Sequence, residues 1–254
     1  MIYEVHRKVN NNVGDFYCNP SRYFNIDNCI SGELMHNKFP VQNQTVIIGG
    51  GGLIHKKFSL HIQDIVKKTP KHTVLWGIGH NFGKKHIQKT KGKVFFPDWI
   101  RECDLIGIRD YVSEYEDLYL PCVSCMHPAF DFEYKTAHKT VYFTHAFKSK
   151  YQPRAADIHM KNDVTDFQKV IKFLASGETV VTDSYHGAYW AQLLGKKVKV
   201  VSWSVKFDNM KHPPCFVKNI YDDSAQGLSA PADFLRECRD LNFAFYQKFK
   251  KLLT

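Results

Sequence analysis

The amino-acid sequence predicts an α/β protein with two Rossmann-like lobes, each built on a parallel β-sheet. Two observations support this fold class. Short apolar and β-branched runs alternate with segments that are apolar at helical spacing, as is typical of βαβ units. A loop rich in Lys and Thr at residues 133–140 interrupts the alternation, which resumes after it. We therefore expect two lobes with a cleft between them, and a single α/β sheet is the alternative.

The first series of elements lies within residues 1–135, which we assign to the N-terminal lobe. Residues 45–48 form a β-branched run followed by four glycines, which predicts a buried strand and a glycine loop. Residues 58–66 predict a helix, and residues 72–80 predict a strand that runs into a glycine turn. Residues 104–110 and 121–125 predict two further short strands.

The second series lies within residues 136–230, which we assign to the C-terminal lobe. Residues 140–145 predict a strand, and residues 164–175 predict an amphipathic helix that ends near Gly177. Residues 179–182 and 198–201 predict two strands on either side of a helical segment. A last helix is expected within residues 231–254, which we treat as a separate C-terminal element.

Composition and cysteine usage favour a cytoplasmic protein. The chain has 254 residues, of which 44% are hydrophobic, and no apolar run approaches the roughly 20 residues of a membrane span. The N-terminus lacks the apolar core of a secretory signal. Seven cysteines, an odd number, favour free thiols in a reducing compartment. Cys122, Cys125 and His127 have a metal-like spacing, but no second Cys pair accompanies them, so we expect no metal site.

The net charge of +10 limits the classes of partner. A basic surface suits an anionic small substrate, an acidic polymer or nucleic acid. The lysines are dispersed along the chain, and no nucleic-acid-binding motif accompanies them. We therefore expect no nucleic-acid partner.

The strongest candidate site lies between the strands at residues 179–182 and 198–201. Ser184 and His186 stand where a strand ends and a helix begins, and Gly187 would permit close approach of a ligand. A helix N-terminus at that edge offers free N–H groups and a positive dipole end, which suit an anion. The alternative is structural: Asp183 or Ser184 caps the helix and His186 is a satisfied core histidine.

Three other predicted strand ends carry candidate residues. Gly50 and Gly51 lie in a glycine run whose N–H groups would cradle a phosphate, or else make a tight turn. His80 follows Gly79 and would act as an acid, a base or a hydroxyl binder, or lie on the surface. Arg109 ends a buried strand and would bind phosphate or carboxylate, or pair with Asp110.

An ordered set of motifs between residues 12 and 201 resembles the polysaccharide pyruvyl transferase family. The set comprises Gly14-Asp15 after Asn12, the strand and glycine run at residues 47–54, Gly77-Ile78-Gly79, Arg109-Asp110 with Ser113, and Ser184-Tyr185-His186-Gly187 leading to Gly195. The resemblance implies a GT-B-like fold and transfer of pyruvate from phosphoenolpyruvate to sugar hydroxyls as a ketal. The acceptor would be a glycan or a glycan precursor in polysaccharide biosynthesis. It implies no metal and no cofactor, because phosphoenolpyruvate is the donor substrate.

The resemblance also assigns roles to residues. His186 would be the acid or a phosphate contact, and Asp15 or His80 would orient or deprotonate the acceptor hydroxyl. The substrate-binding residues would be Asn12, Gly50, Gly51, Arg109, Ser184 and Gly187.

One departure from the family pattern concerns Tyr185, which stands where members often carry an arginine. Lys148, Lys150, Lys196 or Lys206 would have to replace the missing charge.

Two other functions are compatible with the sequence. The first is a nucleotide-sugar-dependent GT-B glycosyltransferase, for which Asp208, Asp222 and Asp223 are candidates to bind ribose hydroxyls. The second is a non-catalytic glycan-binding relative, which the missing arginine favours. The sequence predicts neither the acceptor sugar nor the oligomeric state.

Overall fold

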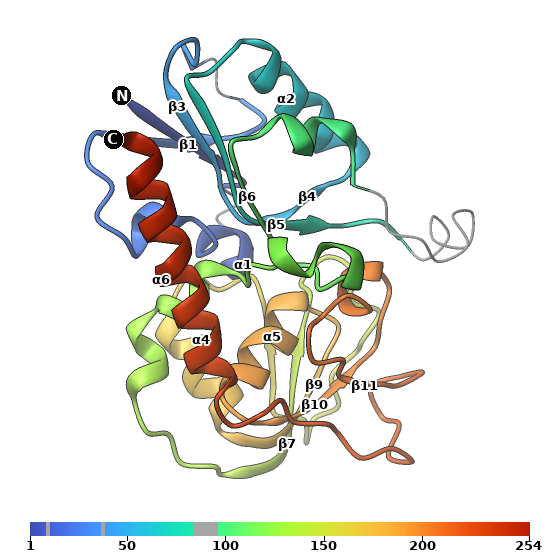
Figure 1. The fold of residues 1–254 in the computed structure, drawn as a ribbon. Coiled ribbons are helices and arrows are strands. Elements are labelled where there is room, and N and C mark those ends of the chain that lie inside the picture. The colour runs from blue at the N-terminus through green and yellow to red at the C-terminus, as the bar shows by residue number, and fades with distance from the viewer. Residues whose placement is uncertain (9–10, 37–38, 84–95) are drawn as a thin grey trace.

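The chain forms two α/β lobes, each with a parallel sheet flanked by helices, in a computed structural model that describes residues 1–8, 11–36, 39–83 and 96–254 (Figure 1). The predicted fold class, α/β with two Rossmann-like lobes, is confirmed. The two sheets belong to successive parts of the chain, so the single-sheet alternative is wrong.

The N-terminal lobe has a sheet in the order β2-β1-β3-β5-β4, with β6 also paired to β5. Every one of these strand pairs is parallel. The central strands β3 and β5 are almost wholly buried, which is why they read as continuous apolar runs. The elements are β1 (Ile2–His6), α1 (Val13–Phe16), β2 (Cys29–Glu33), β3 (Thr45–Ile48), β4 (Gly51–Ile54), α2 (Lys56–Lys67), β5 (His72–His80) and β6 (Leu105–Ile108).

The C-terminal lobe has a parallel sheet in the order β11-β10-β9-β7-β8. Its helix α4 begins where the Asp166 carboxylate accepts a hydrogen bond from the Lys169 N–H at 3.0 Å. Its helix α5 is buried along its whole length. The elements are β7 (His138–Thr144), β8 (His159–Lys161), α4 (Phe167–Ala175), β9 (Gly177–Thr182), α5 (Tyr185–Leu193), β10 (Lys197–Val200) and β11 (Cys215–Phe216).

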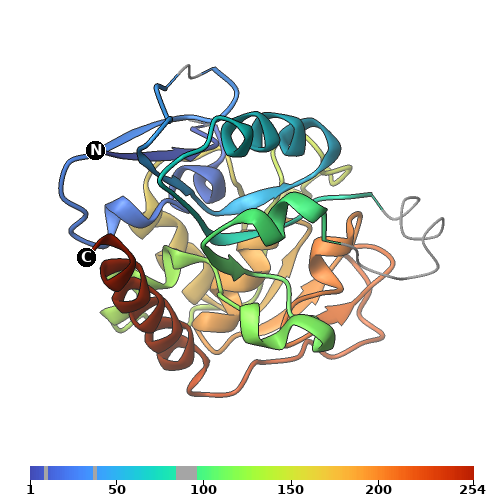
Figure 2. The same ribbon diagram turned by 45° about the horizontal axis from the view of Figure 1, so that its top comes forward.

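Helix α6 (Phe234–Leu253) joins the two lobes, because it runs along the side of both (Figure 1). Phe234 packs in the core of the C-terminal lobe, whereas Phe245 and Phe249 pack with Trp76 in a core of the N-terminal lobe. Midway, the buried Asn242 side chain accepts a hydrogen bond from Trp76 Nε1 at 3.0 Å. The chain therefore ends in the lobe where it starts, and the two termini lie near each other (Figures 1 and 2).

Three predicted local structures are wrong. The glycine run at residues 49–52 is not a loop throughout, because Gly51 and Gly52 begin β4. Gly77 and Gly79 lie inside β5, not in a turn after it, and a bulge at Gly77 with φ +65° lets the strand continue to His80. Residues 121–125 do not form a strand: a short 3₁₀ helix occupies Val123–Met126, and its apolar side chains are buried beside α6. An apolar run of that length is equally compatible with either structure.

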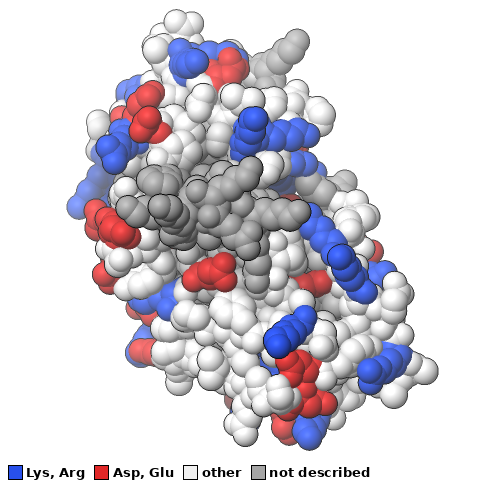
Figure 3. Space-filling view, turned by 90° about the vertical axis from the view of Figure 1, so that its right-hand side faces the viewer, with Lys and Arg blue, Asp and Glu red and all other residues white. Residues whose placement is uncertain are grey.

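The helices and the surface bear on the expected absence of a membrane span and on the positive net charge. In the part of the chain that the structure describes, no helix combines the length and apolar character that a bilayer crossing requires. Figure 3 shows a face on which Lys and Arg are interspersed with Asp and Glu.

The position of α6 leads to a stability prediction. Phe249→Ala empties a site in the N-terminal core where the side chain is 1% exposed, so we expect a loss of about 3 to 5 kcal/mol in unfolding free energy. Phe243→Ala, on the same helix but 54% exposed, is the matched control and is expected to change stability by less than about 0.5 kcal/mol. Urea denaturation measures both, and equal effects would contradict this packing.

Candidate functional site

A cavity of about 230 Å³ lies where the carboxyl ends of both sheets meet. Arg7 follows β1, Arg109 follows β6, His145 follows β7 and Ser184 follows β9, so strand ends of both lobes contribute. This is the position in which open α/β sheets bind ligands. The lining residues are Arg7, Asn12, Asp15, Gly52, Leu53, Phe58, Asn81, Arg109, His145, Lys148, Asn162, Ser184, Tyr185, His186 and Lys206.

Helix α1 of the N-terminal lobe contacts the C-terminal lobe at this cavity. The backbone N–H of Val13 donates to the Asn162 carbonyl at 3.0 Å, and Asn162 Nδ2 donates to Asn12 Oδ1 at 3.1 Å. Asn12 Oδ1 also accepts from the Gly14 N–H at 3.2 Å and thereby caps α1. Asn12 is thus a lobe-bridging residue on the wall of the cavity.

Gly14 is required by the His186 ring. A Cβ placed on Gly14 would lie 2.0 Å from His186 Nδ1, so only glycine lets α1 approach this closely. The ring is also packed against Trp190, with centroids 5.0 Å apart, so it has little room to retreat. The Gly14-Asp15 motif therefore sets the distance between α1 and α5.

Arg109 is held in the cavity wall, and it forms no ion pair with the residues that the structure describes. Its guanidinium carbon lies 3.9 Å from the centroid of the Tyr185 ring, and its Nε has no hydrogen-bond partner among the described residues. Asp110, the alternative partner, instead accepts from His80: its Oδ2 lies 2.9 Å from His80 Nδ1. The stem of Arg109 passes over Gly79, where a Cβ would lie 2.7 Å from it. Arg109 is therefore buried, charged and available to an anion.

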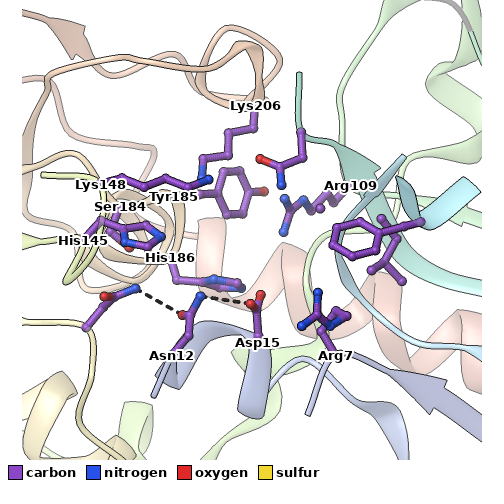
Figure 4. A pocket seen from close by; sticks show the side chains of 15 residues that line it. Arg7, Asn12, Asp15, Arg109, His145, Lys148, Ser184, Tyr185, His186 and Lys206 are labelled. Carbon is purple, nitrogen blue, oxygen red and sulfur yellow. Dashed lines mark hydrogen bonds between the residues drawn. The ribbon is translucent and has the colours of Figure 1, made fainter. Parts of the chain in front are cut away.

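Two lysines from the C-terminal lobe face the same space (Figure 4). Lys148 Nζ and Lys206 Nζ each lie 4.1 Å from the centroid of the Trp203 ring. Burial, together with the charges of Arg109 and Lys148, lowers the pKa of Lys206 to about 7. Burial and these two lysines also lower the pKa of His145 to about 4, so His145 is neutral at physiological pH. The uncompensated positive charge is what a bound anion would relieve.

Asp15 is the carboxylic acid among these bases. Burial raises its pKa, and the nearby charges of Lys206 and Arg109 partly oppose that rise. Its Oδ2 accepts a hydrogen bond from Asn12 Nδ2 at 2.9 Å. Asp15 is therefore more readily protonated than an exposed aspartate, which suits general acid–base chemistry.

The protonation state of His186 differs from that of a catalytic acid, which would be a protonated imidazolium. Burial lowers its pKa well below the usual value, and the charges of Arg109 and Lys206 lower it further. The unliganded protein therefore holds a neutral imidazole here, which binds by hydrogen bonds and carries no proton to give away as an acid.

The structure brings five of the predicted site residues into one cavity: Asn12, Asp15, Arg109, Ser184 and His186. Ser184 caps α5, with its Oγ accepting from the Gly187 N–H at 3.5 Å. Gly187, Gly50, Gly51 and His80 do not line the cavity. A Cβ on Gly187 would meet Phe143 at 2.5 Å and Thr182 at 2.6 Å, so this glycine serves packing of α5 on the sheet.

Other cavity residues were not predicted. Arg7, Asn81, His145 and Asn162 each stand directly after a strand. The strands β5 and β7 were predicted, so Asn81 and His145 could have been identified from their position at a strand end. Arg7 and Asn162 follow β1 and β8, which were not predicted. Of the four candidate replacements for the missing arginine, Lys148 and Lys206 line the cavity. Lys150 does not, and Lys196 Nζ instead donates to Thr136 Oγ1 at 2.9 Å.

The chain segments described hold no group of three or more His, Cys, Asp or Glu side chains that could bind a metal ion. Within the metal-like spacing, His127 Nδ1 accepts a hydrogen bond from the Ala129 N–H at 3.0 Å.

Comparisons with known proteins add only the fold. No protein-family model and no curated protein sequence matches the chain. Among solved structures, the chain is similar to a functionally uncharacterised protein from Klebsiella pneumoniae subsp. pneumoniae NTUH-K2044. That match has a TM-score of 0.50 and 16% sequence identity, and it covers 85% of this chain and 92% of the other. The likeness extends over both lobes and carries no statement about activity.

The contact between α1 and α5 predicts a specific effect of one methyl group. Gly14→Ala forces the His186 ring out of its packing, so we expect a loss of about 1 to 3 kcal/mol in unfolding free energy. Gly83→Ala is the control, because a Cβ there meets no atom of the described residues within 4 Å. Denaturant titration reports both variants, and a Gly14→Ala protein as stable as the wild type would refute the close contact.

Proposed function

We propose that this protein transfers pyruvate from phosphoenolpyruvate to two hydroxyls of a sugar, forming a cyclic ketal and releasing phosphate. The observation that carries the proposal is the charge of the cavity. Among the described residues that line this small space, four carry basic side chains, namely Arg7, Arg109, Lys148 and Lys206, and one, Asp15, carries an acid (Figure 4). The motif resemblance to the polysaccharide pyruvyl transferase family supports the same reaction.

Phosphoenolpyruvate matches this charge. Its phosphate and carboxylate together carry up to three negative charges and require donors on more than one side. Arg7 is partly neutralised, because its Nε lies 2.7 Å from Glu33 Oε1. Arg109, Lys148 and Lys206 lack such a partner among the described ion pairs and are assigned to the phosphate and the carboxylate.

Lys148 and Lys206 are assigned the role of the arginine that family members often carry at the position of Tyr185, because they supply the positive charge that Tyr185 lacks. The Tyr185 ring lies beneath Arg109, so it orients an arginine from the opposite lobe. The departure from the family pattern therefore leaves the anion site charged, which favours a binding-competent enzyme over a relative without activity.

Asp15 is assigned the proton chemistry. Protonated Asp15 gives its proton to the methylene carbon of phosphoenolpyruvate, while the oxygen of a first sugar hydroxyl bonds to C2. That hydroxyl returns its proton to Asp15. The oxygen of a second hydroxyl then bonds to C2 as the bond from C2 to the phosphate oxygen breaks, and its proton leaves on the phosphate. A bound trianion next to Asp15 raises its pKa further, so the substrate itself favours the protonated acid.

The nucleotide-sugar alternative has less support. A volume of about 230 Å³ is small against the roughly 300 to 1,000 Å³ of sites for larger ligands. None of Asp208, Asp222 and Asp223 lines the cavity.

A direct test incubates the protein with phosphoenolpyruvate and a panel of galactosides, glucosides and N-acetylhexosaminides. We expect phosphate release together with an acceptor product that carries one pyruvyl group by mass spectrometry. Thermal-shift screening of UDP- and GDP-sugars in parallel tests the alternative. Binding of a nucleotide sugar without any binding of phosphoenolpyruvate would refute the proposal.

The pKa of Lys206 predicts the pH dependence of binding. Lys206 loses its charge as the pH rises through about 7, so affinity for phosphoenolpyruvate should fall over that range. A bound anion stabilises the ammonium and raises its pKa, so binding above pH 7 should take up a proton. Calorimetry in buffers of different ionisation enthalpy measures this uptake.

Variants isolate the contribution of Lys206. We expect Lys206→Met to weaken binding by roughly 10- to 100-fold, the effect of losing one charged hydrogen bond, and to reduce the proton uptake to the part that Asp15 contributes. Lys150→Met, outside the cavity, is the control and should retain both. Unchanged proton uptake in Lys206→Met would show that another group titrates.

A further inference from the structure

A buried chain of four side chains lies behind the cavity, and we call it the Cys122 relay. Trp190 Nε1 donates to Ser124 Oγ at 2.9 Å, Ser124 Oγ lies 3.3 Å from Cys122 Sγ, and Cys122 Sγ lies 3.5 Å from His186 Nε2. Trp190, Ser124 and Cys122 are fully buried. None of these three side chains lines the cavity, whereas His186 does.

The first hydrogen bond of this relay has a fixed direction, whereas the geometry of the next two is compatible with either direction. An indole N–H can only donate, so Ser124 Oγ accepts from Trp190 and has its own proton left to give. In the relay that proton goes to Cys122 Sγ. With that direction the thiol keeps its S–H for His186 Nε2, which makes this ring nitrogen an acceptor.

The other nitrogen of His186 faces the opposite way. Nδ1 points at α1, where the Cβ position of Gly14 lies 2.0 Å from it. A neutral imidazole carries one proton, on one of its two nitrogens. The low pKa of His186 keeps the ring neutral, so the proton that is excluded from Nε2 resides on Nδ1.

We propose that the Cys122 relay fixes His186 in the Nδ1–H tautomer, so that the ring presents a hydrogen-bond donor on the α1 side of the anion cavity. The role in anion binding rests on the proposed function, whereas the tautomer does not. Cys122 and Ser124 are positioning residues in this scheme. They make His186 a donor to phosphate or carboxylate and leave proton transfer to Asp15.

The tautomer is measurable by ¹⁵N NMR of the imidazole rings. The chain has 13 histidines, so a His186→Gln spectrum identifies the signals of His186. In the wild type we expect Nδ1 at the shift of a protonated nitrogen and Nε2 at that of an unprotonated one. Cys122→Ala removes the donor to Nε2 and should move both shifts toward the opposite tautomer, while binding of phosphoenolpyruvate weakens by about threefold to tenfold.

Two further variants separate the relay from general packing effects. Cys122→Ser keeps a donor at this position and should restore the wild-type tautomer. Cys125→Ala removes another fully buried thiol, one that accepts from Asn242 and lies outside the relay, and should leave the His186 shifts unchanged. These shifts report the proton position on the ring, which a loss of stability alone does not reverse.

The outcomes distinguish the relay from the proposed function. A protonated Nε2 in the wild type, or shifts that Cys122→Ala leaves unchanged, would overturn the relay whether or not phosphoenolpyruvate binds. The expected shifts in a protein that binds no phosphoenolpyruvate would support the relay and overturn the proposed function.

Discussion

The contact of Gly14 with the His186 ring is the constraint on which the site depends. It brings α1 of one lobe against α5 of the other, and the hydrogen bonds of Asn12 and Val13 to Asn162 hold that approach. Helix α6 supports it from outside by packing in both cores. A looser fit between the lobes would let water between the charges and weaken their action on a ligand.

Charge concentration is the energetic cost of this arrangement. Arg109 and Lys206 are buried near each other, and the low pKa of Lys206 records how unfavourable a second charge is there. Charge repulsion of this kind is typical of binding sites, because a bound ligand relieves it. It lowers the folding stability below that of a variant with apolar side chains at the same positions. In the proposed function, the cationic side chains supply charge, the neutral His186 supplies a hydrogen-bond donor, and Asp15 transfers protons.

Much of the fold was predictable, because buried parallel strands such as β3, β5 and β9 are short apolar runs and α4 has a clear helical period. Strand β1 was missed because two of its buried residues, Glu4 and His6, are polar. Local pattern placed Arg109 and His186 at element ends, and the family resemblance alone pointed to Asp15. Local pattern did not single out Lys206 from the four candidate lysines, because the position of Lys206 depends on the Trp203 ring and on the opposite lobe.

A crystal structure of the protein with phosphoenolpyruvate tests the central claim most directly, namely that a small polyanion binds between the two lobes. We predict phosphate and carboxylate density in the cavity, in contact with Arg109 of the N-terminal lobe and with Lys148 and Lys206 of the C-terminal lobe. An empty cavity at a saturating concentration of phosphoenolpyruvate, or a ligand bound elsewhere, would contradict the account.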